Sequence, residues 1–96
     1  MDLTELIVEK RAQILETAAK RGAHDVRVFG SVARGDYDEN SDVDFLVELE
    51  PGRSLFDLSG LIADLEELLG VKVDVGTYKM LKARNREQIL KEAVSL

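Results

Sequence analysis

The ten residues from Ser41 to Glu50 constrain the fold most, because apolar and polar side chains alternate along them. One set of alternating positions is wholly apolar: Val43, Phe45, Val47 and Leu49. The other set consists of Asp42, Asp44, Leu46 and Glu48. A period of two residues predicts a β-strand whose two faces differ chemically. We therefore expect a sheet with one face against a core and with Asp42 and Asp44 on the other face.

Periodic apolar residues elsewhere in the chain predict two more strands and three helices. In chain order, the elements are a helix over residues 3–18, strands over 26–29 and 42–49, a helix over 55–69, a strand over 71–75 and a helix that includes 89–94. Asp2 with Glu5 and Ser54 with Asp57 have the spacing of helix-capping pairs. We expect Gly22 and Gly70 to end the first two helices, since glycine is common just past a helix C-terminus.

This order of elements predicts an α/β (α+β) fold, in which helices pack on a small sheet. The connection between Gly30 and Asp42 is too short for an ordinary helical crossover, so we expect the sheet to be mixed. Ninety-six residues leave room for a single domain over 1–96. A composition of 45% hydrophobic residues is sufficient for a core.

Charge and composition exclude several classes of protein. Thirteen basic and nineteen acidic residues give a net charge of −6, so we do not expect direct nucleic-acid binding. The absence of cysteine removes disulfides, thiolate metal sites and cysteine nucleophiles. The sequence has no signal-peptide pattern and no apolar run of about 20 residues, and we expect a cytoplasmic protein that does not associate with membranes.

Asp42 and Asp44 form the first candidate site. Alternate residues of a strand point to one face with Cα atoms about 6.5–7 Å apart, so the two carboxylates would repel each other. Mg²⁺ prefers oxygen ligands and often binds one or two carboxylates together with substrate phosphates. A pair of such ions can activate an attacking oxygen and stabilise a leaving one. Asp74, on another predicted strand, is a candidate third carboxylate.

Gly30 and Ser31 follow the first predicted strand and form a second candidate site. Glycine allows a ligand to approach the backbone closely, and amide N–H groups at the start of a helical turn suit phosphate. The Ser31 hydroxyl adds a donor. Either motif alone is most often an ordinary turn or a solvated strand. Together they favour phosphoryl or nucleotidyl transfer, with carboxylates holding the metals and the turn holding the phosphates.

The combined pattern resembles a known signature. Gly30-Ser31, Ala33-Arg34-Gly35 and Ser41-Asp42-Val43-Asp44 are similar to the motif of the DNA polymerase beta-like nucleotidyltransferase superfamily, specifically its minimal nucleotidyltransferases. The resemblance covers nearly the whole chain and implies the polymerase beta-like fold. It also implies that Asp42 and Asp44 bind Mg²⁺, that Asp74 is the third acidic residue and that Gly30-Ser31 holds the nucleotide phosphates.

Several other polar residues have a functional and a structural interpretation. The resemblance places Arg34 near phosphate, but an ion pair with Asp36 or Asp38 on a helix surface is as good an explanation. Ser41 either contacts the nucleotide or caps the start of the strand. His24, the only histidine, is expected to have a structural or surface role. Residues 79–96 carry five bases and two acids, and this stretch either holds a phosphate or a partner or is a solvated helix face.

The resemblance implies a specific activity. A Mg²⁺-dependent enzyme would transfer AMP from ATP to a hydroxyl, expected to be a tyrosine of a HEPN RNase toxin, and so act as the antitoxin of a type VII-like pair. The chain would then form a hetero-oligomer with the toxin, or a homo-oligomer. The alternatives are a non-catalytic antitoxin that neutralises its partner by contact, and transfer to a small molecule such as an aminoglycoside.

Overall fold

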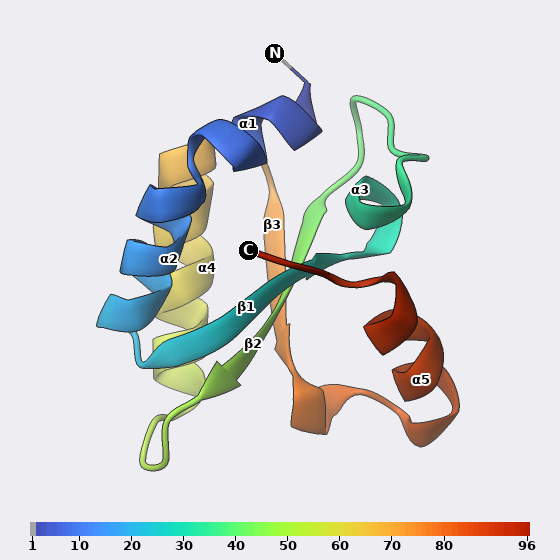
Figure 1. The fold of residues 1–96 in the computed structure, drawn as a ribbon. Helices are drawn as coiled ribbons and strands as arrows, with labels where there is room; N and C mark the ends of the chain where they lie inside the picture. The colour runs from blue at the N-terminus through green and yellow to red at the C-terminus, as the bar shows by residue number, and fades with distance from the viewer. Residues whose placement is uncertain (1) are drawn as a thin grey trace.

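The structure, a computed structural model, describes residues 2–96. Its elements in chain order are α1 (Leu3–Glu9), α2 (Arg11–Lys20), β1 (Ala23–Phe29), α3 (Gly30–Arg34), β2 (Val43–Leu49), α4 (Leu55–Leu69), β3 (Val73–Thr77), the 3₁₀ helix η1 (Tyr78–Met80), α5 (Ala83–Glu92) and β4 (Val94–Ser95). Figure 1 shows α2 and α4 on one side of the sheet and α3 and α5 on the other. The predicted α/β class is confirmed.

The sheet is mixed, as expected from the short connection after Gly30. Its strand order is β3-β2-β1-β4, with β1 antiparallel to β2 and β4, and β2 parallel to β3. The carboxyl end of β1 therefore lies beside the amino ends of β2 and β3. Register places Phe29, the last residue of β1, opposite Asp44, and places Asp44 beside Asp74. This end of the sheet gathers the polar residues that the sequence singled out.

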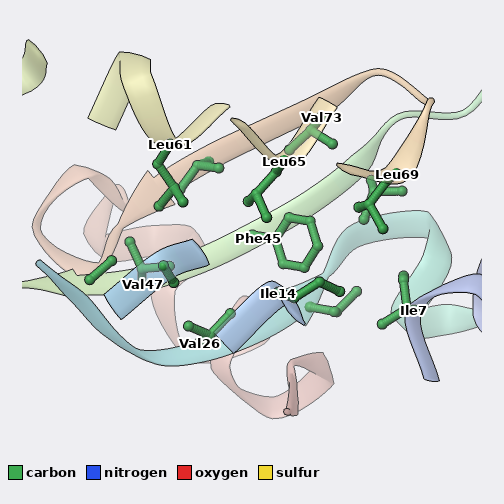
Figure 2. Packing of buried hydrophobic residues seen from close by; sticks show 14 of the residues in the cluster. Ile7, Ile14, Val26, Phe45, Val47, Leu61, Leu65, Leu69 and Val73 are labelled. Atoms are coloured by element: carbon green, nitrogen blue, oxygen red, sulfur yellow. The ribbon is translucent and has the colours of Figure 1, made fainter. Parts of the chain in front are cut away.

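The core lies between the sheet and the helix pair α2 and α4. Phe45 is fully buried at its centre, and Figure 2 shows its ring between Leu65 of α4 and Ile14 of α2. Val43 and Val47 are also fully buried, which confirms that one face of β2 packs against a core. Leu46 points to the other face and is fully buried as well.

The helix α4 begins and ends as its sequence predicts. The Ser54 side chain accepts a hydrogen bond from the amide of Phe56, and the Asp57 side chain accepts one from the amide of Ser54, which completes a capping box. Gly70 ends the helix in the left-handed region with φ +69°. Within residues 2–96, neither α4 nor any other helix is sufficiently long and apolar to cross a membrane.

The predicted helix over 3–18 is divided in the structure. Lys10 leaves helical geometry with φ −93° and ψ 7°, although its amide still donates to Leu6 and its carbonyl accepts from Ile14. The bend turns α1 across the end of the sheet, so that Ile7 joins the core (Figures 1 and 2). Neither glycine nor proline marks this bend, and the apolar period continues through it.

Strand boundaries also differ from those predicted. β1 begins at Ala23 and contains an irregular register between His24 and Arg27, where Asp25 adopts φ +53°. β2 begins at Val43, so Asp42 lies just before the strand. The third strand covers 73–77 instead of 71–75, because pairing with β2 begins at Val73. Local periodicity cannot locate these limits, which depend on the partner strand.

The predicted C-terminal helix ends earlier than its apolar spacing suggests. α5 stops at Glu92, and Val94–Ser95 forms a fourth strand, β4, antiparallel to β1. The helical assignment of Ala93 and Val94 was therefore wrong. The edge of β1 offers unpaired backbone groups, and the last residues satisfy them, including a bond from the Leu96 amide to the Val26 carbonyl.

Candidate active site

Gly30 joins β1 to α3 at the point where the sheet ends. Its φ of +74° lies in the left-handed region, which favours glycine. A Cβ at this position would overlap the Asp44 carboxylate and would lie 3.2 Å from Asp44 Cγ. The turn and the carboxylate are therefore in direct contact. Ser31 follows as the second residue of α3 and is half-buried.

Three carboxylates lie at this end of the sheet. Asp44 and Asp74 are register partners on the parallel strands β2 and β3, so they are neighbours on the face opposite the core. Asp42 lies outside β2, and the loop before the strand, not the strand period, sets its orientation. Its charge nevertheless acts on Asp44. The structure thus places Asp74 next to the Asp42 and Asp44 segment, although about 30 residues of sequence separate them.

The Asp44 carboxyl lies in an environment that disfavours its charge. Burial raises its pKa above the usual range, the negative charges of Asp74 and Asp42 raise it further, and the positive charge of Arg34 lowers it. Ionisation of Asp44 is therefore less favourable here than in water. Attraction to a cation would offset this repulsion between carboxylates.

The donor set fits a hard divalent cation that also binds substrate oxygens. In the described range of 2–96, no three acidic or histidine side chains are close enough together to hold a metal ion on their own. Mg²⁺ commonly binds one or two carboxylates and completes its octahedron with water and phosphate oxygens. Half-buried Asp44 and its neighbour Asp42, beside a turn suited to phosphate, match that requirement.

Arg34 stands at the end of α3, near the carboxylates. Its Nε donates to Asp36 Oδ2 at 3.1 Å, and its Nη1 donates to Glu92 Oε2 at 3.4 Å. The expected ion pair with Asp36 is present. The pair with Glu92 was missed, because nothing in the sequence connects two residues 58 positions apart. Arg34 remains close enough to Asp44 to lower the pKa of that carboxyl.

Ser41 organises the loop that leads into β2. Its Oγ accepts a hydrogen bond from the Asp38 amide at 2.9 Å, and its own amide donates to the Asp38 carbonyl at 3.1 Å. The amide of Asn40 donates to Asp38 Oδ1 at 2.8 Å. These bonds support the local capping role of Ser41, and they fix the loop that orients Asp42.

Two grooves lie at opposite ends of the sheet. One, of about 620 Å³, is lined by Tyr37, Ser41, Asp42 and Lys72 among others, so of the three aspartates it reaches Asp42. The other, of about 630 Å³, is lined by residues that include His24. His24 is exposed near the start of β1, and Gly30 follows that strand's far end, so the histidine takes no part in the carboxylate site.

Comparison with known proteins gives consistent matches. A family model described as a nucleotidyltransferase domain matches residues 8–96. A relative from Methanocaldococcus jannaschii, described as a protein adenylyltransferase, is 42% identical over 90 residues, which are 94% of this chain and 97% of the relative. The solved structure of a minimal nucleotidyltransferase is 50% identical with a TM-score of 0.87, and the match covers 100% of this chain and 97% of that one.

A more distant structure shares the fold. The crystal structure of a toxin–antitoxin pair with AMP-PNP matches 88% of this chain and 69% of that chain, with a TM-score of 0.74 and 19% identity. Together the matches confirm the predicted similarity to minimal nucleotidyltransferases and the predicted enzyme class. The family model covers almost the entire chain, and this protein therefore belongs to the nucleotidyltransferase domain family.

Proposed function

We propose that this protein transfers AMP from ATP to a hydroxyl of a partner protein. The observation that carries the proposal is the contact between the Gly30 turn and Asp44, with Asp74 beside Asp44 on the next strand. A phosphate-binding turn and a row of carboxylates in contact are what transfer at a phosphorus atom needs. The family membership limits the chemistry to nucleotidyl transfer.

Different residues of the chain would bind the phosphates and activate the acceptor hydroxyl. Gly30 and Ser31 would hold the β- and γ-phosphates through the backbone and the Ser31 hydroxyl, and Arg34 would add a positive charge. Asp74 would orient the acceptor hydroxyl and accept its proton. The acceptor oxygen would form a bond to the α-phosphorus, the bond from that phosphorus to the bridging oxygen would break, and pyrophosphate would leave.

Asp42 and Asp44, with Asp74 as the third acidic residue, would hold Mg²⁺, with two ions expected. The bound metal would supply positive charge that stabilises the attacking and leaving oxygens. Burial raises the pKa of Asp44, and repulsion from Asp74 and Asp42 raises it further; this supports the role because a cation would relieve the repulsion. Ser41 would act on the site through the loop that it shapes before Asp42.

The proposed acceptor is a tyrosine of a HEPN RNase toxin, and the protein would act as the antitoxin. Two comparisons support a protein acceptor and a toxin–antitoxin pair, while the tyrosine and the HEPN class follow from the sequence resemblance. A relative that matches this chain over 97% of its own length is described as a protein adenylyltransferase. A protein with the same fold occurs in a toxin–antitoxin pair that was crystallised with AMP-PNP. These descriptions favour a protein acceptor over an aminoglycoside.

The proposal is tested with the purified protein, ATP, Mg²⁺ and the toxin encoded beside it. Mass spectrometry of the toxin should show one or more added AMP groups, and peptide mapping should place them on a tyrosine. An unmodified toxin under conditions in which the protein binds ATP would contradict the proposal. If the Asp42→Asn, Asp44→Asn variant neutralised the toxin without ATP, the protein would act by contact alone.

A further inference from the structure

Two carboxylates from different parts of the chain hold the Arg34 guanidinium. Asp36 is two residues away and accepts from Nε, whereas Glu92 comes from α5 and accepts from Nη1. The second oxygen of Glu92 accepts a hydrogen bond from Gln88 Nε2 at 2.7 Å. The net charge of Arg34 with its two partners is −1, so in this arrangement the guanidinium attracts phosphate weakly.

The geometry of the guanidinium adds a second constraint. It binds a phosphate strongly through two parallel N–H donors on one edge, either Nη1 with Nη2 or Nε with Nη2. Glu92 engages one donor of the first edge and Asp36 engages one donor of the second. Asp36 therefore occupies the Nε side, and a phosphate that approaches Nη1 and Nη2 competes with Glu92 for Nη1 and for the guanidinium charge.

Glu92 is the carboxylate that a phosphate displaces more easily. Its contact with Arg34 is longer, 3.4 Å against 3.1 Å, and Gln88 still satisfies one of its oxygens after release. Asp36 is confined by the short chain between it and Arg34. We propose that Glu92 is a latch that competes with the nucleotide phosphates for Arg34, so that nucleotide binding releases α5 from α3. This inference rests on the proposed function, in which Arg34 contacts phosphate.

The packing of α5 suits such a release. Each of its ten residues is exposed or half-buried, with Ile89, Leu90 and Glu92 as the half-buried ones. The helix is thus held with little buried apolar surface, and the Glu92 pair ties it to α3. Segments of this kind open at low free energy. Breaking the pair should therefore increase the mobility of residues 83–92.

The first test compares the affinity of two variants for AMP-PNP with Mg²⁺ by calorimetry. Glu92→Gln removes the competing charge and should bind about two- to fivefold more tightly than the original protein, the range expected for an ion pair that solvent still reaches. Glu87→Gln makes the same change in net charge at an exposed position of α5, and its affinity should be close to that of the original protein. Equal effects of the two variants, or weaker binding by Glu92→Gln, would overturn the latch.

The second test measures amide hydrogen exchange of the original protein. AMP-PNP with Mg²⁺ should accelerate exchange over residues 83–92, and Glu92→Gln should show faster exchange there before nucleotide is added. Slower or unchanged exchange in α5 on saturation with nucleotide would overturn the proposal. If the original protein does not bind AMP-PNP at all, the proposed function fails instead. Equal melting temperatures of the two variants would exclude a general loss of structure.

Discussion

Replacing Gly30 with alanine tests the contact between the turn and the carboxylate. Alanine at φ +74° carries the strain of the left-handed region, about 1–2 kcal/mol. Its Cβ also overlaps the Asp44 carboxylate, which must rotate away at a further cost of about 0.5–1.5 kcal/mol. We expect a total loss of about 1.5–3.5 kcal/mol in the free energy of unfolding, which leaves the protein folded.

Gly35 provides a matched control for this substitution. It ends α3 with φ +82°, but a Cβ there meets no atom within 4 Å. Gly35→Ala should therefore show the backbone strain alone, about 1–2 kcal/mol. In a domain of this size each kcal/mol lowers the melting temperature by roughly 4–8 °C, so calorimetry can separate the two variants.

Transfer activity gives the sharper distinction between the two glycine variants. Displacement of a reacting group by about 1 Å can reduce a rate about 100-fold, so Gly30→Ala should lose nearly all transfer of labelled AMP. Gly35→Ala should retain most of it, because Asp44 is undisturbed. Equal stability losses, together with normal activity of Gly30→Ala, would refute the account of Gly30 as a close-contact residue.

Three further predictions concern stability. Phe45→Ala removes the fully buried side chain at the centre of the core and should cost about 3–5 kcal/mol in urea unfolding, whereas Phe56→Ala, at a side chain that is 89% exposed, should change stability by less than about 0.5 kcal/mol. Ser54→Ala removes a cap of α4 and should cost about 1 kcal/mol, and an unchanged denaturation midpoint would contradict that role. The hydrogen bond from the Ser54 amide lowers the pKa of Asp57 in the folded protein. Ionised Asp57 therefore stabilises the fold above the unfolded-state pKa of about 4, and this contribution is lost as the pH falls through the lower folded-state pKa. Asp57→Asn should reduce stability at neutral pH and make the melting temperature less dependent on pH on the acid side.

Local sequence signals predicted the elements whose formation depends on nearby residues. The limits of α4 follow from Ser54, Asp57 and Gly70, which act within a few residues of the helix ends. The core face of β2 follows from the period of Val43, Phe45 and Val47. Periodicity and capping depend on residues that are close together in the chain, so both can be recognised from the sequence alone.

Features that depend on distant partners could not be predicted in the same way. β4 forms because Val94 and Ser95 reach the edge of β1, and their own apolar spacing suggested a helix. The proximity of Asp74 to Asp44 required the parallel register of β2 and β3. The pair between Arg34 and Glu92 required the packing of α5 against α3. The sequence motif identified the candidate aspartates, and the strand pairing explains how they meet.

The most direct test of the account is transfer of AMP from α-labelled ATP to the toxin by the Asp42→Asn, Asp44→Asn variant. Both substitutions preserve side-chain size, and circular dichroism should show the original fold. The account predicts that transfer falls to the background measured without Mg²⁺, while the original protein labels the toxin. Labelling by the folded double variant at a rate close to that of the original protein would contradict the central claim that these carboxylates carry the reaction.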